Sequence, residues 1–300
     1  MKSILVICGP TATGKTAAAL ELAQKIDAEI ISVDSGQIYR GMDIGTAKPT
    51  ADEQSQITFH LINIKNPDEI FSAADFEQLA TQAIHDIHAR GKRVILCGGT
   101  GLYLRALEAG VFEGPSRSDD IRKELEEEIH QEGLTALRRL HDELRSIDPQ
   151  AAASIPFQNR QRLIRALEVY RLTGKPISQF WLEQETTKKK SPFLFQKFAL
   201  DLPKEELNQR IEKRVDQMME MGLAREVENL FERWGSQAPG LQMIGYKEII
   251  GCLRENESMD LAVELIKKHT RNYAKRQLTW FRKDKKNIWV KSFLEIFPKT

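Results

Sequence analysis

Apolar residues alternate along this chain between short unbroken runs and longer stretches at helical spacing. Unbroken runs occupy residues 3–8, 29–33 and 93–97, and each is followed by a loop rich in Gly, Ser, Thr or Asp. Such runs are typical of strands that are buried on both faces. Residues 15–26 and 76–90 instead carry apolar side chains every three or four positions, as amphipathic helices do. The repeated order of strand, loop and helix predicts an α/β fold with a parallel sheet.

The pattern changes in the middle of the chain. Residues 117–185 show helical periodicity only, and a polar stretch at 186–192 follows them. Strand-like and helix-like patterns then return. We therefore expect an α/β core built from residues 1–115 and 191–300, interrupted by an all-helical insertion domain at 116–190.

The loop after the first predicted strand reads Gly-Pro-Thr-Ala-Thr-Gly-Lys-Thr, which matches G-x-x-x-x-G-K-[ST]. It lies between a buried strand and a helix, the context that this phosphate-binding motif requires. Backbone N–H groups, the helix N-terminus and Lys15 would attract a polyphosphate there, and the Thr16 hydroxyl suits Mg²⁺. This predicts a P-loop-type parallel sheet flanked by helices, with a di- or triphosphate ligand. The residues expected to bind the phosphates are Gly9, Pro10, Thr11, Ala12, Thr13, Gly14, Lys15 and Thr16.

A carboxylate follows the second predicted strand, whereas the third predicted strand ends in Gly98-Gly99-Thr100 without one. P-loop hydrolases normally carry an acid on a strand beside the loop, where it holds Mg²⁺. Asp34 is expected at the carboxyl edge of the sheet, next to the phosphates. A metal ligand and a base acting on an incoming nucleophile are both compatible with this position, and spacing alone leaves both open.

The composition is that of an ordinary globular protein. The 300 residues are 41% hydrophobic and 29% charged, with a formal net charge of +1. These values exclude a disordered, collagen-like or membrane-spanning chain. The N-terminal apolar run leads straight into the glycine-rich loop, so we expect no signal peptide and a cytoplasmic protein. Cys8, Cys97 and Cys252 form neither a disulfide nor a zinc pattern, and we expect the first two to be buried.

The near-neutral total hides a strong segregation of charge. Residues 119–148 hold ten acids and five bases, whereas residues 265–291 hold ten bases and one acid. Tyr273, Trp280 and Phe281 are interleaved with these bases, which suits phosphate binding combined with base stacking. The alternative is an amphipathic helix with aromatic side chains in the core. We expect Trp280 in the core and the basic side chains of this segment facing a nucleic acid.

Two arginines share one face of a helix predicted after Pro203, which is expected at its first position, and before Gly222, expected just beyond its end. Arg210 and Arg214 are four residues apart. By spacing alone, a solvated arginine pair is the simpler interpretation. The opposite, apolar face consists of Leu207, Ile211, Val215 and Met218.

Several blocks together resemble the tRNA dimethylallyltransferases, the bacterial adenosine-37 isopentenyltransferases. The match runs in order from about residue 4 to residue 290, and its most specific block is 34–49. The other blocks are 9–16, 98–103, 159–168 and 275–282. The resemblance implies transfer of a dimethylallyl group from dimethylallyl diphosphate to N6 of adenosine 37, beside the anticodon. The tRNA anticodon stem-loop and dimethylallyl diphosphate are thus the implied partners.

The resemblance also implies roles for individual residues. Asp34 would accept the proton of the adenine amine, and Thr100 would lie beside the reacting centre. Lys15 and Arg214 would hold the diphosphate, with Mg²⁺ at Thr16 as the cofactor. The implied tRNA contacts are Asp34, Ser35, Gly36, Gln37, Thr100, Arg122, Gln158, Asn159, Arg160, Gln161, Arg162, Lys275, Arg276, Gln277 and Arg282.

Two other functions remain as alternatives to a monomeric, Mg²⁺-dependent tRNA prenyltransferase. A P-loop kinase acting on a small molecule or nucleotide predicts ATP turnover without RNA. A non-enzymatic RNA-binding protein with a vestigial P-loop predicts that an Asp34→Ala variant behaves like the parent.

Overall fold

The structure, a computed structural model, describes residues 3–111, 114–187 and 191–296. Residues 188–190 are outside the described residues. They are the last residues of the expected insertion, and they belong to the polar stretch at 186–192.

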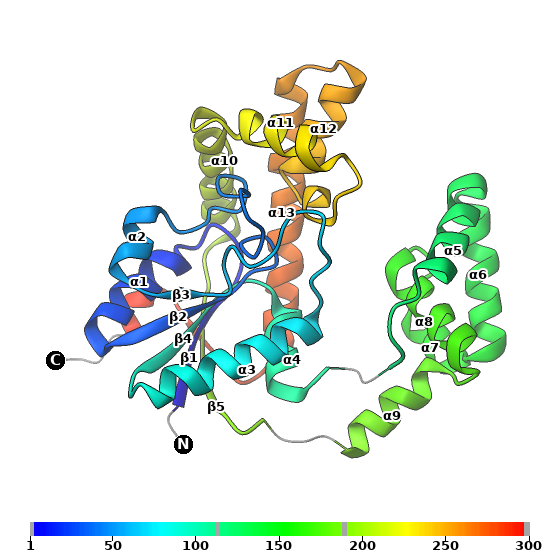
Figure 1. Ribbon diagram of the computed structural model, residues 1–300, viewed down its shortest axis with the longest axis horizontal. Helices are drawn as coiled ribbons and strands as arrows, with labels where there is room; N and C mark the ends of the chain where they lie inside the picture. Colours follow the sequence, from blue (N-terminus) through cyan, green and yellow to red (C-terminus); the bar gives the residue numbers. More distant parts are fainter. Residues whose placement is uncertain (1–2, 112–113, 188–190, 297–300) are drawn as a thin grey trace. The chain divides into compact units, whose positions relative to one another are not determined.

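The chain forms two compact units. One comprises Met1–Glu108 and Ser191–Thr300, and the other comprises Ala109–Lys190. The first unit is a sheet covered by helices, and the second is built from helices (Figure 1).

Within the described residues, six strands form one sheet in the larger unit, in the order β3-β2-β4-β1-β5-β6. Their bounds are β1 Ser3–Cys8, β2 Ala28–Val33, β3 Phe59–His60, β4 Arg93–Gly98, β5 Leu194–Leu200 and β6 Asn287–Val290. All neighbours pair in parallel, which confirms the predicted fold class. The carboxyl ends of the strands therefore meet at one edge, where open α/β sheets bind ligands.

Helices cover both faces of this sheet. On one face α1 (Lys15–Ile26) packs its buried side chains against Ile7, Ile30 and Ile95. On the other face α3 (Ala73–Ala89) and α4 (Gly101–Ala109) join a core that includes Val6, Ile31 and Leu96 from the sheet and Phe281 from α13 (Met259–Lys283). Burial on both faces explains why the central strands are unbroken apolar runs.

A second core of the larger unit joins the segment after β2 to helices near the C-terminus. Ile38 and Met42 of that segment are buried against Val215, Leu230 and Tyr246. The helices are α10 (Lys204–Glu220), α11 (Leu223–Trp234), α12 (Tyr246–Glu255) and α13. This packing brings chain segments far apart in sequence to the same edge of the sheet.

The helical unit has its own core. Its elements are α5 Asp119–Glu132, α6 Leu134–Ile147, α7 Pro149–Ser154, α8 Arg160–Thr173 and α9 Ile177–Thr187. Leu125, Leu140 and Leu167 are buried within that core. Glu168 is also fully buried, and its carboxylate accepts hydrogen bonds from Arg122 and Arg165.

The structure corrects some local expectations and confirms others. Pro203 is the N-cap of α10 and precedes its first residue, whereas Gly222 follows the helix with φ +96° as expected for a stop. Cys8 and Cys97 are buried, as predicted. Short elements without a prediction include α2 (Ala51–Gln56), β3 and α4. Among the helices that the structure describes, none has the length and apolar character that a bilayer span requires.

Candidate active site

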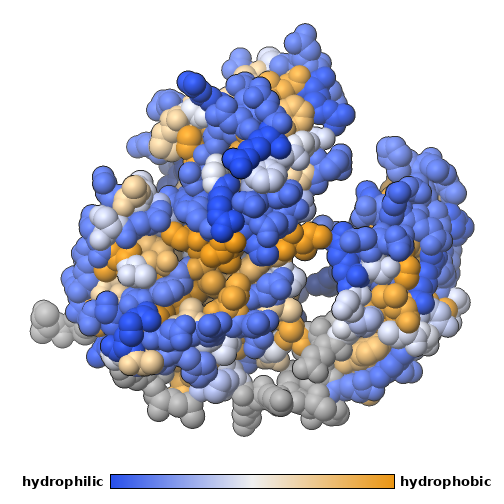
Figure 2. All heavy atoms as spheres, viewed as in Figure 1, coloured by the Kyte–Doolittle hydropathy of each residue, from blue (hydrophilic) through white to orange (hydrophobic). Residues whose placement is uncertain are grey.

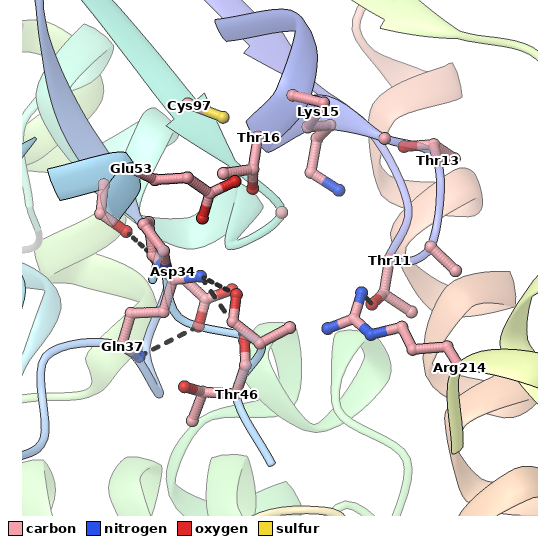
Figure 3. Close-up of a pocket in the computed structure, with 18 of the residues that line it drawn as sticks. Thr11, Thr13, Lys15, Thr16, Asp34, Gln37, Thr46, Glu53, Cys97 and Arg214 are labelled. Atoms are coloured by element: carbon pink, nitrogen blue, oxygen red, sulfur yellow. Dashed lines mark hydrogen bonds between the residues drawn. The ribbon is translucent and has the colours of Figure 1, made fainter. Parts of the chain in front are cut away.

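A cavity of about 480 Å³ lies at the carboxyl edge of the sheet. Its walls come from the P-loop, the segment after β2, the end of β4, and helices α10 and α13 (Figure 3). In Figure 2 apolar residues form a band across the middle of the larger unit, between polar surfaces on either side. The cavity lining combines P-loop residues, Asp34 and Arg214 with apolar side chains such as Ile30, Phe59 and Met218, so it has a polar end and apolar walls.

The P-loop forms the polar end of the cavity. Gly14 is the N-cap of α1 in the left-handed conformation, at φ +84°, which a residue with a Cβ adopts only with strain. The Thr13 hydroxyl donates to the carbonyl of Pro10 at 2.9 Å, and the Lys15 ammonium donates to the same carbonyl at 2.5 Å. The N-terminus of α1 and the ammonium of Lys15 therefore both lie at the polar end of the cavity.

Two cations share this end of the cavity. Burial, and to a lesser degree the neighbouring Arg214, lower the pKa of the Lys15 ammonium to about 8. Burial also lowers the pKa of the Arg214 guanidinium, whereas the charge of Asp34 raises it. Two half-buried cations side by side are costly in the absence of an anion. The arrangement therefore favours a ligand that carries at least two negative charges.

Helix α10 supplies the second cation. The Arg214 guanidinium donates to the Thr11 hydroxyl at 3.1 Å, which ties the helix to the P-loop. Arg210 also lines the cavity, and it forms an ion pair of 2.7 Å with Glu206. Arg214 is half-buried in the cavity, whereas Arg210 is solvent-exposed at its rim, so the simpler interpretation of a solvated residue holds for Arg210 and fails for Arg214.

Asp34 follows β2 and faces the same cavity (Figure 3). Its Oδ1 accepts hydrogen bonds from the backbone N–H groups of Gly36 at 2.8 Å and Gln37 at 3.4 Å. Since both bonds use Oδ1, proton uptake at Oδ2 would leave this turn intact.

The Gln37 side chain is part of the cavity wall. Its Oε1 accepts from the Ser32 hydroxyl at 2.8 Å, and its Nε2 donates to the Ala47 carbonyl at 3.3 Å. The segment that contains Ala47 is held in turn by Glu226, whose carboxylate accepts three backbone N–H groups at 2.8–3.2 Å. Those N–H groups belong to Asp43, Ile44 and Gly45.

Thr100 connects the loops after β2 and β4. Its hydroxyl accepts from the Ser35 N–H at 3.1 Å, and its own N–H donates to the Val33 carbonyl at 3.1 Å. Tyr273 of α13 also lines the cavity, and burial together with the charge of Asp34 raises the pKa of Tyr273 to about 12. At pH 7 this phenol is therefore neutral and remains a hydrogen-bond donor.

The residues near Thr16 are compatible with a magnesium ion bound together with a diphosphate. Thr16, Asp34 and Glu53 all line the cavity, and Figure 3 shows the Glu53 carboxylate pointing toward Thr16. Oxygen donors of this kind suit Mg²⁺. Within the described residues no cluster of three or more His, Cys, Asp or Glu side chains could hold a metal by itself. The phosphate oxygens would therefore have to supply further ligands.

The apolar walls of the cavity were not predicted. Ile30, Phe59 and Pro49 lie on the β2–β3 side, and Met218 and Met221 lie on α10. These side chains offer a surface for a short hydrocarbon group beside a phosphate site.

The predicted tRNA contacts on α13 fall into two groups. Lys275 and Arg276 are exposed, and Arg282 forms a 3.2 Å ion pair with Asp201 at the surface. Gln277 is only 6% exposed, and its amide bonds to two loops of the cavity. A basic face of α13 is therefore available to a polyanion, whereas Gln277 lies inside.

The predicted tRNA contacts in the helical unit also differ among themselves. Gln158, Arg160, Gln161 and Arg162 are exposed around the start of α8, whose N-cap is Asn159. Arg122 instead donates to the buried Glu168 at 2.7 and 2.9 Å.

Arg122 therefore has a structural partner within its own unit. Although burial raises it, hydrogen bonds from Arg122 and Arg165 lower the pKa of Glu168 to about 2. The buried carboxylate is thus charged at neutral pH, and it depends on both arginines for its stabilisation.

Sequence reasoning missed several residues that shape the cavity, among them Glu53, Glu226 and Tyr273. Thr50 and Glu53 form a capping box, and that spacing is a readable signal for α2. Tyr273 was interpreted as an aromatic side chain for base stacking. Glu226 acts across a distance of about 180 residues in the sequence, which no local pattern indicates.

Comparisons with known proteins agree with this geometry. Residues 37–284 match the family model of the IPP transferases. The chain is 49% identical over 291 residues to tRNA dimethylallyltransferase 2 of Geotalea daltonii, covering 96% of this chain and 87% of that protein. It is 45% identical over 289 residues to a tRNA dimethylallyltransferase of Halalkalibacterium halodurans, with coverages of 96% and 90%.

Solved structures give the same result. The full-length tRNA isopentenylpyrophosphate transferase of Bacillus halodurans superposes with a TM-score of 0.71 at 42% identity, covering 99% of this chain and 94% of that one. A eukaryotic dimethylallyltransferase acting on tRNA gives a TM-score of 0.74 at 31% identity, with coverages of 94% and 70%.

Proposed function

Because this chain belongs to the IPP transferase family, we propose that it transfers a dimethylallyl group from dimethylallyl diphosphate to N6 of adenosine 37 of tRNA. The observation that carries the proposal is the cavity in which Lys15 and Arg214 face Asp34 beside apolar walls. Cations suit the diphosphate, the apolar walls suit the five-carbon group, and the carboxylate suits an amine that must lose a proton.

The diphosphate departs from the polar end of the cavity. In the transfer, the bond between C1 of the dimethylallyl group and the ester oxygen of the first phosphate breaks, and its electrons stay with the diphosphate. The ammonium of Lys15, the guanidinium of Arg214 and the N-terminus of α1 neutralise the charge that develops on the leaving oxygen. The P-loop thus serves a leaving group, and no triphosphate hydrolysis is required.

The adenine amine attacks from the side of Asp34. Its lone pair is delocalised into the ring, so the N6 atom is a weak nucleophile and needs close positioning and a proton acceptor. N6 forms a bond to C1 while one of its protons passes to Oδ2 of Asp34. The two N–H groups bound to Oδ1 hold the carboxylate in place during this step.

Thr16 would hold a magnesium ion bound to the diphosphate. The ion supplies charge neutralisation to the leaving group. Thr16, Asp34 and Glu53 are the oxygen donors in its vicinity, and the role of a metal ligand assigned to Thr16 follows from the P-loop motif.

We further infer that tRNA binds through its anticodon stem-loop, with adenosine 37 unstacked into the cavity. The exposed cations Lys275 and Arg276 on α13 support this inference, as do Arg160 and Arg162 at the start of α8. The proposed enzyme works as a monomer in the cytoplasm, where its tRNA substrate is found.

The test is to incubate the protein with dimethylallyl diphosphate labelled in the prenyl group, Mg²⁺ and total tRNA, and to locate the label. We expect label on N6 of adenosine 37 and release of one diphosphate per prenyl group. A parallel reaction with ATP and no RNA tests the kinase alternative, which requires ATP turnover there. If no labelled tRNA forms in the first reaction, the proposal is refuted.

Asp34→Ala tests the role of the carboxylate. We expect a loss of kcat of about 10²–10⁴-fold with tRNA affinity retained, because general base catalysis contributes that much. Turnover close to that of the parent would exclude Asp34 as the base.

A further inference from the structure

The side-chain amide of Gln277 connects two loops of the active site. Its Oε1 accepts from the N–H of Thr11 in the P-loop at 2.9 Å, and its Nε2 donates to the carbonyl of Gly99 at 2.9 Å. These loops follow β1 and β4, which are neighbours in the sheet. One amide thus satisfies a donor of one loop and an acceptor of the other.

The backbone around Gln277 leaves room for this contact only because it contains glycine. A Cβ on Gly99 would lie 2.2 Å from Nε2 of Gln277, and a Cβ on Gly101 would lie 2.2 Å from Nε1 of Trp280. Gly99, in the loop after β4, and Gly101, at the start of α4, thus leave space for two side chains of α13. These glycines make room for the side chains of a neighbouring helix, whereas Gly14 of the P-loop allows a left-handed turn of the backbone.

The bond to Thr11 changes how the P-loop is held. A backbone N–H of such a loop is normally directed at phosphate, but the Thr11 N–H is committed to Gln277. The Thr11 hydroxyl is likewise bonded to Arg214. The beginning of the loop is therefore fixed from outside, by α13 and α10, before any ligand binds.

The same helix also contacts the other side of the reacting centre. Tyr273 lies one turn before Gln277 and lines the same cavity, close to Thr100 and Asp34. Thr100 in turn binds the Ser35 N–H, next to Asp34. Gln277 thus bonds the phosphate loop to the loop of Thr100, and Tyr273 lies on the same helix beside that loop and Asp34.

We propose that Gln277 is a positioning residue for prenyl transfer, which sets the distance between the diphosphate site and the loop of Thr100, and that it does not contact tRNA. This inference rests on the proposed function and replaces the tRNA-binding role that the family resemblance implied for Gln277. Lys275 and Arg276, on the exposed side of the same turn, keep the role of RNA contacts. One helical turn thus faces the nucleic acid on one side and orders the catalytic loops on the other.

Gln277→Leu and Gln277→Glu test the proposal. Leucine has a similar volume and removes both hydrogen bonds, whereas glutamate keeps the acceptor for Thr11 and loses the donor for Gly99. Pyrophosphate affinity is measured by calorimetry, tRNA affinity by filter binding, and kcat and KM for dimethylallyl diphosphate by label transfer. The matched control is Lys275→Ala with Arg276→Ala, and melting curves establish that each variant is folded.

For Gln277→Leu we expect the pyrophosphate Kd to rise and kcat to fall, each by about tenfold, since two buried hydrogen bonds are lost. The tRNA Kd should stay within about twofold of the parent value. For the control pair we expect the opposite pattern, with weaker tRNA binding and unchanged pyrophosphate binding. Gln277→Glu keeps the acceptor for Thr11 but places a carboxylate beside the phosphate site, so its pyrophosphate Kd should also rise while its tRNA Kd stays within about twofold of the parent value.

Weaker tRNA binding with unchanged pyrophosphate affinity in Gln277→Leu would overturn the proposal and restore an RNA contact. Parent-like values in all assays would overturn it as well. If Gln277→Leu fails to fold, the same affinities and kinetic constants are measured on the isosteric Gln277→Glu variant, and they test the proposal in its place. Pyrophosphate binding requires no turnover, so this test stands even if the parent protein transfers no prenyl group, the result that defeats the proposed function.

Discussion

Lys15 stabilises a bound anion at the expense of the free protein. Burial lowers the pKa of its ammonium from 10.5 to about 8. One pKa unit corresponds to ~1.4 kcal/mol, so a difference of about 2.5 units means that folding disfavours the charged ammonium by about 3 kcal/mol. Lys15→Met keeps most of the aliphatic stem and removes the charge, so it should stabilise the free protein at pH 7 by up to that amount.

The dependence on pH follows from the sign of the shift. Below pH 8 the ammonium is charged in both the folded and the unfolded chain, and the destabilisation is complete. Between pH 8 and 10.5 the unfolded chain binds more protons than the folded one, so the stability of the parent rises with pH. The advantage of Lys15→Met should therefore shrink over this interval and vanish above it.

Thermal melting of the two proteins between pH 6 and 10.5 measures this effect. A gain of about 3 kcal/mol corresponds to ~6 °C in Tm for a chain of this size. Saturating pyrophosphate should reverse the order, because only the parent gains the ion pair with the ligand. Lys25→Met, which removes an exposed ion pair with Glu21, is the control and should change Tm little. A free Lys15→Met protein no more stable than the parent at pH 7 would refute the reasoning.

Three further predictions concern other parts of the molecule. Changing Lys275 and Arg276 to Ala should lower tRNA affinity and reduce the slope of log K against log salt by about 1.5, measured by titration at several salt concentrations. An unchanged slope would show that they do not contact phosphates. Arg122→Ala should destabilise the helical unit by about 2–4 kcal/mol, since it removes a partner of the buried Glu168; selective loss of tRNA affinity with unchanged melting would contradict this. Glu226→Gln should destabilise the protein by about 1–3 kcal/mol, because backbone N–H groups lose an acceptor, and parent-like urea unfolding would argue against it.

The parts of the fold that sequence predicted well are those encoded locally. The strands at 3–8 and 93–97 are unbroken apolar runs because both of their faces are buried, and the P-loop between strand and helix has a fixed spacing. Asp34 was placed at the cavity by the same logic, since the carboxyl ends of parallel strands meet at one edge. The two-residue strand β3 is too short to produce a periodic signal, and it was missed.

The remaining site residues depend on contacts between distant segments. The family resemblance implied that Gln277 contacts tRNA, and only the packing of α13 against Gly99 shows that its side chain is buried. The resemblance likewise implied a tRNA contact for Arg122, while its partner Glu168 is 46 residues away. Charge patterns indicate which segments are basic, but they do not distinguish an arginine that faces solvent from one that satisfies a buried acid.

The order of strands in the sheet also has a consequence for synthesis on the ribosome. β1 lies between β4 and β5, so one edge of this central, apolar strand stays unpaired until residues 194–200 have emerged. The helical unit at 109–190 is continuous in sequence and is complete earlier. Nascent chains that stall after the helical unit would therefore expose an open β1 edge, a known template for aggregation. The helical insertion delays closure of the sheet, and for that interval the growing protein depends on chaperones more than its finished fold indicates.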